Sequence, residues 1–314
     1  MIFKNILMCK PKYFDVVHYK LNSHMLMQRD VNISKSMTQW VSLKHKLDDC
    51  LVDLKFVKPK KNLVDMVFAA NGGLVYKNKA LVANFSAIPR QPESKYYYKF
   101  FDKHGFDTYD LETNFEGAGD GLFSHDHHNL WLGYGFRSDL DARNEVSDII
   151  SEPNLNIHSL KLEKENFYHL DTCFCPIGHN HVLIYPKAFD TENLYKIYDV
   201  FGERNCIQVS DEDANNFACN SICVEKNIGG INYTTIIGNK FSEQLKNTLY
   251  YLDYEVIEND MSEFLLSGGS TKCCILSLDY GFGNRMFDVD NIVDENYYEM
   301  REMREMRTYR YNDI

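Results

Sequence analysis

The sequence has little proline, no long apolar run and no excess of positive charge. Only seven of its 314 residues are proline, so few helices or strands need to be interrupted. No window approaches the ~18 consecutive apolar residues of a membrane-spanning helix, and the run at Met1–Met8 is too short for a signal peptide. The formal net charge of −11 argues against general nucleic-acid binding, which needs a positive surface to meet phosphate. We therefore predict neither a membrane protein nor a nucleic-acid binder.

The nine cysteines lack the even number and regular spacing of a disulfide framework. Several lie inside apolar runs, so reduced thiols in a cytoplasmic protein are the simpler interpretation. Hydrophobic residues make up 44% and aromatic residues 14% of the chain, which is typical of a globular protein. No linker rich in proline, glycine and serine divides the sequence, and this favours a single domain.

Short apolar runs alternate with mixed charged segments along the whole chain. The runs, which we expect to contain strands, are Ile6–Met8, Leu63–Ala70, Leu81–Phe85, Leu130–Leu132, His181–Tyr185, Ile228–Ile237 and Cys273–Leu278. Between them, Trp40–Leu47 and Ser242–Leu252 carry apolar residues at helical spacing. Strands that alternate with helices indicate an α/β protein.

Polar residues recur just after such runs at nearly constant intervals. They are Asn22, Asn71, Glu116, His169, Asn220 and Cys273, and successive members are separated by 49, 45, 53, 51 and 53 residues. A period of roughly fifty predicts repeated supersecondary units arranged around an axis. Each unit would then present one polar side chain to a shared centre.

Cys273 is the candidate nucleophile. It follows the glycine turn of Ser267–Lys272 and begins an apolar run, so it could be a reactive thiol or a buried strand residue. In a strand, alternation would place Cys273 and Cys274 on opposite faces, and the preceding turn favours Cys273 as the one that faces a central site. A covalent cysteine enzyme also needs an acid–base group and carboxylates.

Two other segments supply those groups. In a strand, His169 and Asp171 would share one face, where His169 could act in acid–base catalysis. A lone histidine in a strand is usually a core or surface residue, and a histidine that shares its face with an aspartate is more suggestive. Glu116 and Asp120 flank the glycines of residues 117–119. They could orient the histidine or bind a cation, or they could be solvated carboxylates of a turn.

Four more polar residues have a functional and a structural interpretation. Asp65 and Asn71 border the apolar segment Met66–Ala70, where capping of a strand end is the simpler role. Arg90 and Arg137 could bind a carboxylate together through bidentate contacts. Exposure on the surface is the alternative for both arginines.

Three clusters contain metal-binding residue types. They are His125–His128, the pair His179 and His181, and the pair Cys173 and Cys175. None has the paired ligand spacing of a known structural zinc site. Solvated loops are the preferred interpretation, and we predict no metal.

Taken together, these segments resemble the guanidine-modifying (pentein) superfamily of arginine deiminases, dimethylarginine dimethylaminohydrolases, arginine dihydrolases and amidinotransferases. The similar segments, in family order, are LMCKPKYFDVVHYKLN (7–22), VDMVFAANGGLV (64–75), PRQPE (89–93), FEGAGD (115–120), LWLGYGFRSD (130–139), YHLDTCFCP (168–176), NNFACNSI (215–222) and SEFLLSGGSTKC (262–273). The resemblance implies a five-bladed α/β propeller of ββαβ units with a narrow central site. Residues 1–285 would form this domain, and residues 286–314 would be a charged C-terminal extension.

The resemblance also implies roles for individual residues. The implied nucleophile, acid–base residue and carboxylate partner of that residue are Cys273, His169 and Glu116. The implied substrate-binding residues are Asn22, Asp65, Asn71, Arg90, Asp120, Arg137 and Asp171. Among these, Asp171 matches a guanidinium ligand, and Arg90 with Arg137 matches the pair that holds the α-carboxylate of the substrate. Asn22 and Asn71 match asparagines of the arginine dihydrolase branch.

The implied activity is hydrolysis of C–N bonds in a linear amidine, either arginine or a methylated arginine. Cys273 would form a thiouronium adduct that releases citrulline, or ornithine after a second cycle, together with ammonia or methylamine. The resemblance implies a small guanidino compound as the binding partner and neither a metal nor an organic cofactor, and it leaves a homo-oligomer open. An amidinotransferase and a non-catalytic binding protein of the same fold are the alternatives.

Overall fold

The computed structural model describes residues 5–17, 23–26, 30–50, 52–124, 127–178 and 180–279. Asn22, His125, Asp126, His179 and the C-terminal extension expected at residues 286–314 lie outside the described residues. The predicted domain boundary at residue 285 therefore stays a prediction. None of the helices in the described part of the chain has the length and apolarity needed to cross a bilayer.

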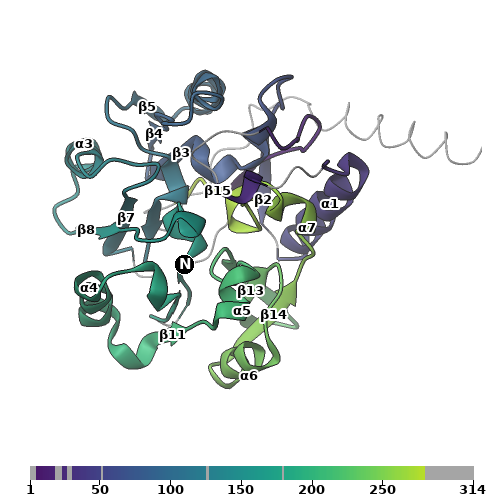
Figure 1. Cartoon of the computed structure of the whole chain (residues 1–314), viewed down its shortest axis with the longest axis vertical. Coiled ribbons are helices and arrows are strands. Elements are labelled where there is room, and N and C mark those ends of the chain that lie inside the picture. Colours follow the sequence, from purple (N-terminus) through teal and green to yellow (C-terminus); the bar gives the residue numbers. More distant parts are fainter. Residues whose placement is uncertain are drawn as a thin grey trace, which may run out of the picture. The chain divides into compact units, whose positions relative to one another are not determined.

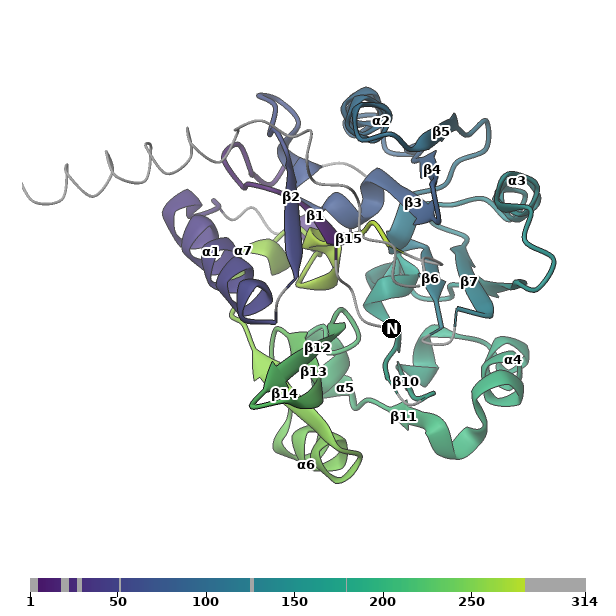
Figure 2. The same cartoon turned by 180° about the vertical axis from the view of Figure 1, so that it is seen from behind.

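Five sheets of three strands each make up the sheet structure of the described residues. They follow one another around a common centre in both views (Figures 1 and 2). In order within each sheet, the strands are β15 (Leu276–Ser277), β1 (Asn5–Cys9) and β2 (Asp53–Val57); β3 (Gly73–Tyr76), β4 (Lys79–Val82) and β5 (Asp107–Asp110); β6 (Gly121–Phe123), β7 (Asn129–Tyr134) and β8 (Asn156–Lys161); β9 (Phe174–Pro176), β10 (Val182–Ile184) and β11 (Cys206–Gln208); β12 (Ile222–Ile228), β13 (Ile231–Gly238) and β14 (Tyr254–Glu258).

In each of these sheets the central strand is antiparallel to one neighbour and parallel to the other. A parallel pair needs a long crossover, which a helix supplies in each sheet: α1 (Ile33–Asp49), α2 (Ser94–Lys103), α3 (Ala142–Ile150), α4 (Thr191–Phe201) and α6 (Glu243–Tyr251). The shorter helices α5 (Asp211–Asn215) and α7 (Ser262–Leu265) lie in connections. This arrangement is a five-bladed propeller of ββαβ units, and it confirms the predicted α/β fold.

One blade is closed by the two ends of the described chain. β1 pairs with β15, which places Leu7 opposite Leu276. A further hydrogen bond runs from the Asn5 N–H to Asp279 Oδ2 at 3.0 Å. Because β15 begins three residues after Cys273, closure of this sheet also fixes the position of the candidate nucleophile.

Helix α1 shows how the helices cover the sheets. Asn32 caps its N-terminus by accepting a hydrogen bond from a main-chain N–H of the first turn at 3.0 Å. Its inner face buries Trp40, Leu43 and Leu47, which recur at helical spacing. These side chains share a hydrophobic core with Ile6 of β1, so the helix and the central strand of its blade stabilise each other.

Most predicted apolar runs contain part of a strand. Ile6–Met8, Leu81–Phe85, Leu130–Leu132, His181–Tyr185 and Ile228–Ile237 overlap β1, β4, β7, β10 and β13 respectively. The prediction for Leu63–Ala70 is wrong, because two 3-10 helices, Val64–Val67 and Ala69–Gly72, cover most of it. Both helices are largely buried. A buried segment this short is apolar whether it is a 3-10 helix or a strand, so its composition does not distinguish the two.

The described members of the recurring polar series lie before the first strand of a blade. The 3-10 helices Ala69–Gly72, Gly117–Gly119, Leu170–Thr172 and Lys272–Cys274 precede β3, β6, β9 and β15. Asp171 and Cys273 therefore lie in 3-10 turns, and the strand geometry predicted for them is wrong. A 3-10 turn has three residues per turn, so strand alternation does not decide which way Cys273 and Cys274 point.

Replacing Ile6 by alanine should lower the free energy of unfolding by about 2–5 kcal/mol. Ile6 is fully buried in the central strand of the closing blade, and its truncation leaves a cavity there. Ile231→Ala is the matched control, because Ile231 of β13 is 59% exposed and should change the free energy by less than about 0.5 kcal/mol. Equal losses for the two variants in denaturant titrations would contradict the assigned role of β1.

Candidate active site

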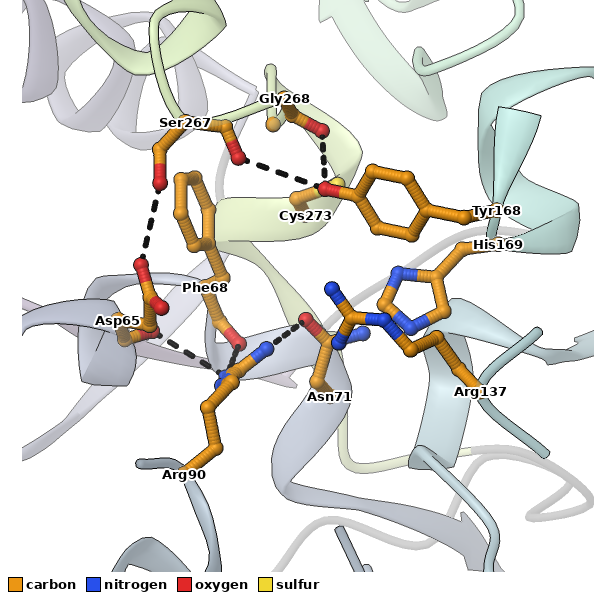
Figure 3. Close-up of a pocket in the computed structure, with 11 residues that line it drawn as sticks. Asp65, Phe68, Asn71, Arg90, Arg137, Tyr168, His169, Ser267, Gly268 and Cys273 are labelled. Atoms are coloured by element: carbon orange, nitrogen blue, oxygen red, sulfur yellow. Dashed lines mark hydrogen bonds between the residues drawn. The ribbon is translucent and has the colours of Figure 1, made fainter. Parts of the chain in front are cut away.

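A pocket lies where the turns before the blades meet. It is lined by Asp65, Phe68, Asn71, Arg90, Arg137, Tyr168, His169, Ser267, Gly268, Gly269 and Cys273 (Figure 3). About 220 Å³ of empty space lies among these residues, a volume that includes open solvent at the mouth. Six of the predicted site residues thus share one pocket: Asp65, Asn71, Arg90, Arg137, His169 and Cys273.

Glu116 links His169 to Arg137. Its Oε2 atom accepts a hydrogen bond from Arg137 Nη1 at 2.9 Å and lies 2.8 Å from His169 Nε2. Its Oε1 atom accepts from Ser86 Oγ at 3.1 Å. Burial alone would raise the pKa of this carboxyl, but the Arg137 charge and the His169 contact outweigh burial and hold the pKa of Glu116 well below its usual range. Glu116 is therefore a buried anion.

This contact also fixes the His169 ring. A carboxylate can only accept a hydrogen bond, so Nε2 of His169 carries a hydrogen. No residue in the described part of the chain is hydrogen-bonded to the other ring nitrogen, Nδ1. Because His169 lines the pocket, Nδ1 is the atom that can exchange a proton with a ligand, and Glu116 would stabilise the imidazolium.

The Cys273 thiol lies against a carboxylate and an amide. Its Sγ atom is 3.4 Å from Asp171 Oδ2 and accepts a hydrogen bond from Asn220 Nδ2 at 3.1 Å. Burial, followed by the charge of Asp171, raises the pKa of the Cys273 thiol well above its usual value. A thiol in this environment needs a nearby cation before it ionises near neutral pH.

Asp171 has one oxygen without a partner. It does not itself line the pocket, but its Oδ2 atom contacts the sulfur that does, and no described residue is hydrogen-bonded to Oδ1. Burial raises the pKa of Asp171 to about 6. Buried acceptors without partners are rare, and a guanidinium N–H would supply one here. The role of Asp171 as a guanidinium ligand stays a prediction, which this geometry supports.

Arg90 is held by several partners within the protein. Its Nε and Nη2 atoms donate to the two carboxylate oxygens of Glu93 at 3.1 and 2.9 Å. Its Nη1 atom donates to Asn71 Oδ1 at 2.8 Å, and Nη2 also reaches the Asp65 carbonyl at 3.2 Å. These contacts use most of the five guanidinium donors. Arg90 therefore supports the surrounding turns, and its contact with a substrate carboxylate stays a prediction.

Two predicted substrate ligands also connect neighbouring turns. Asp120 does not line the pocket; it accepts from Ser138 Oγ at 2.6 Å and from the Leu170 N–H at 2.9 Å, which anchors the turn that follows the histidine. Asp65 lines the pocket and accepts from Ser267 Oγ at 3.2 Å. Substrate contact stays a prediction for both, and a supporting role fits Asp120 better.

The glycine turn before Cys273 packs against aromatic side chains that the sequence did not single out. The Tyr168 hydroxyl donates to the Gly268 carbonyl at 2.9 Å (Figure 3), and the Arg137 guanidinium lies 4.6 Å from the centre of the Tyr168 ring. Gly268 has a φ of +70°, which favours glycine. A Cβ atom at Gly269 would lie 2.2 Å from the Phe68 ring, so both glycines are needed for this close packing.

Lys272 is a second residue that the sequence did not single out. It is buried next to Cys273, and its Nζ atom donates to the Ala118 carbonyl at 3.1 Å. This bond joins the turn of Cys273 to the glycine turn that follows Glu116. Burial lowers the pKa of Lys272, and the nearby Asp171 charge opposes that effect. Its place directly before the candidate nucleophile is the one sequence feature that could have drawn attention to it.

Cys173, Cys175 and His181, which were considered for metal binding, have other surroundings. All nine cysteines are free and buried, and Cys173 and Cys175 belong to a hydrophobic core. His181 Nδ1 lies 2.9 Å from the Tyr254 hydroxyl. Among the residues that the structure describes, no group of three or more histidine, cysteine, aspartate or glutamate side chains is placed to hold a metal ion.

The chain is similar to known guanidine-modifying enzymes over most of its length. It matches the family described as N,N dimethylarginine dimethylhydrolase, eukaryotic, over residues 15–279. It is 40% identical over 279 residues to the bifunctional arginine dihydrolase/ornithine cyclodeaminase ArgZ of Synechocystis sp., a match that covers 86% of this chain and 37% of ArgZ. It is 30% identical over 268 residues to the N(G),N(G)-dimethylarginine dimethylaminohydrolase of Mycobacterium tuberculosis, which covers 85% of this chain and 84% of that enzyme.

Solved structures agree with these matches. The N-terminal domain of ArgZ, in a cysteine-to-serine mutant bound to substrate, is similar with a TM-score of 0.81 at 36% identity, over 88% of this chain and 98% of that domain. This chain spans 37% of the length of ArgZ, so the similarity concerns that N-terminal domain. The predicted superfamily is confirmed, and the chain belongs to its dimethylarginine dimethylaminohydrolase family.

Proposed function

We propose that this protein is a hydrolase that cleaves a C–N bond of a guanidino substrate through covalent catalysis by Cys273. The observation that carries the proposal is that the Cys273 sulfur and the His169 ring line one pocket, with Asp171 beside the sulfur. A planar cation that reaches the sulfur would meet a carboxylate, a nucleophile and a proton carrier in one place. The names of the relatives, arginine dihydrolase and dimethylarginine dimethylaminohydrolase, support the same reaction class.

The first half of the reaction begins when the substrate cation binds. Its N–H groups pair with Asp171, and its charge offsets part of the cost of ionising Cys273. The thiol proton passes to Nδ1 of His169, and Sγ bonds to the guanidino carbon. His169 then gives that proton to the departing nitrogen, and the C–N bond breaks. Ammonia or a methylated amine leaves, and a thiouronium adduct remains on the sulfur.

The second half hydrolyses the adduct. His169, now neutral, takes a proton from a water molecule whose oxygen bonds to the same carbon. The C–S bond then breaks, and the sulfur keeps the electron pair. The hydroxyl proton of the intermediate leaves to solvent, His169 returns its proton to the sulfur, and a ureido product such as citrulline departs.

Arginine is the first substrate to test. The identity to the arginine dihydrolase ArgZ is 40%, against 30% for the mycobacterial dimethylarginine enzyme. Asn71, which matches an asparagine of the dihydrolase branch, lines the pocket. A second cycle on citrulline would give ornithine with release of a second ammonia and carbon dioxide.

Purified protein should convert arginine or asymmetric dimethylarginine to citrulline or ornithine, with agmatine as a further candidate, and mass spectrometry would identify the products. Cys273→Ser should convert none of them, because the hydroxyl is a far weaker nucleophile than a thiolate. A wild-type protein that turns over no guanidino compound would remove the main support for the proposal. Equal activity in Cys273→Ser would remove Cys273 from its assigned role.

The same incubation separates the alternative functions. An amidinotransferase would pass the amidino group to an added amine, so a guanidino product formed from glycine or lysine would indicate transfer rather than hydrolysis. A binding protein of the same fold would retain the ligand unchanged. Release of citrulline or ornithine with no guanidino transfer product supports the hydrolase.

Glu116→Gln should lower both kcat and the free energy of unfolding. The substitution leaves the buried Arg137 charge uncompensated, which costs about 3–5 kcal/mol, and removes the anion that stabilises protonated His169. Glu192→Gln is the matched control: its ion pair with Lys196 on α4 is exposed and should contribute less than about 1 kcal/mol. Comparable losses for the two variants in chemical denaturation would contradict a buried ion pair at Glu116.

The value of kcat/KM for a cationic guanidino substrate should fall as the pH falls through about 6. Burial raises the pKa of Asp171 to about 6, so acidification below this value neutralises the carboxylate that would bind the cation, and kcat/KM follows groups of the free enzyme. Burial also raises the pKa of Asp120 to about 6. The decrease in kcat/KM below about pH 6 should persist in Asp120→Asn and should be absent from the residual activity of Asp171→Asn. The opposite pattern would assign this pH dependence to Asp120.

A further inference from the structure

Asn220 holds both the main chain and the sulfur of Cys273. Its Oδ1 atom accepts a hydrogen bond from the Cys273 N–H at 3.2 Å, and its Nδ2 atom donates to Cys273 Sγ at 3.1 Å. The same Nδ2 atom donates to the Asp171 carbonyl at 3.1 Å. Asn220 itself is fully buried. Its amide therefore meets the sulfur, the main chain that carries it and the neighbouring acidic turn.

The two main-chain contacts fix which way the amide points. The Cys273 N–H can only donate and the Asp171 carbonyl can only accept, so the oxygen of Asn220 must face the first group and the nitrogen the second. The remaining N–H is then directed at the sulfur. A hydrogen bond to a charged acceptor is about twice as strong as one to a neutral acceptor. This N–H therefore stabilises a thiolate more than a thiol.

The surroundings of the sulfur make this donor important for the stability of a thiolate. Cys273 is 3% exposed, so water contributes little to the stability of a negative sulfur. The neighbouring Asp171 carboxylate, 3.4 Å away, repels a thiolate. Lys272 is buried nearby, but its Nζ atom is directed at the Ala118 carbonyl. Among the described side chains, Asn220 is the one that donates a hydrogen bond to the sulfur, and a main-chain hydrogen bond from Ser270 likewise favours a lower pKa of the thiol.

We propose that Asn220 is a further catalytic residue of this site, whose N–H stabilises the Cys273 thiolate that attacks the guanidino carbon. It acts again when the C–S bond of the adduct breaks and the sulfur takes the electron pair, because the same N–H then faces the leaving thiolate. The proposal rests on the proposed role of Cys273 as the nucleophile. It extends that role by naming a side chain that stabilises both the attacking and the departing sulfur.

Asn239 offers a matched control for a purely structural role. It is 8% exposed, its Nδ2 atom donates to the Asn216 carbonyl at 3.0 Å, and its Oδ1 atom accepts from the Met261 N–H at 2.9 Å. It thus makes the same two kinds of main-chain contact as Asn220 without a contact to a sulfur. Replacing either asparagine by alanine should lower the thermal midpoint of unfolding, whereas only the change at Asn220 should alter the chemistry of Cys273.

The test is the pH dependence of alkylation of Cys273 by iodoacetamide, with the modified cysteine located by mass spectrometry. Asn220→Ala should move the midpoint of the alkylation profile upward by about one to two pH units, the loss expected for one hydrogen bond to a charged group. Asn239→Ala should leave that midpoint unchanged. An unchanged midpoint in Asn220→Ala would overturn the proposal.

Asn220→Asp serves as a second variant if the alanine variant does not fold. It keeps the shape of the side chain and the oxygen that accepts from the Cys273 N–H, but replaces the donor to the sulfur by an oxygen. The midpoint should rise at least as far as in Asn220→Ala, and a midpoint equal to that of the wild type would overturn the proposal. A wild-type protein that hydrolyses no substrate would overturn the proposed function. Alkylation requires no turnover, so this measurement would still decide the role of Asn220 at the sulfur.

Discussion

The matching of buried charges at the centre of the propeller is the constraint on which the site depends. An ionised group removed from water is costly unless an opposite charge or hydrogen bonds replace the solvent. Glu116 meets this requirement through Arg137 and His169, and Arg90 meets it through Glu93. Glu116 and Arg137 belong to the blade of β6–β8, whereas His169 precedes the next blade. Their charges are matched only when the two blades are in place, so the polar centre specifies the fold as well as the chemistry.

The candidate nucleophile enters this centre last along the chain. Cys273 lies three residues before the strand β15, which completes the sheet of β1. The bond from the Asn5 N–H to Asp279 joins residues 274 positions apart. The entropic cost of closing a loop grows only slowly with its length. Closing this long loop therefore costs little more free energy than closing a shorter one. The packing of β1 against α1 thereby positions a thiol whose proposed reaction partners, His169 and Asp171, precede another blade.

The sequence predicts the repeated unit because that unit follows a long-range regularity. Asp65, Arg90 and Arg137 of the pocket lie outside this regularity, and the family resemblance indicated their roles. Asn71, Glu116, His169 and Cys273 each stand in the turn before the first strand of a blade, so their spacing reveals them. The shape of those turns could not be predicted, since a buried 3-10 turn and a buried strand of three residues share a composition and neither is long enough to show a period. Lys272 contacts a distant turn through a single hydrogen bond, and no local pattern marks such a contact.

In the proposed reaction, Asp171 makes the reactivity of the thiol depend on the substrate. Burial, followed by the charge of Asp171, raises the pKa of Cys273, so the free enzyme keeps a neutral and poorly nucleophilic sulfur. A guanidinium that pairs with Asp171 removes this opposition at the moment when its own carbon lies beside the sulfur. The thiolate is then favoured when the substrate carbon lies beside it and disfavoured in the free enzyme, where it could be oxidised. In this proposal the cation is both the substrate and the activator of its nucleophile, which would explain why a buried carboxylate lies next to the thiol of Cys273.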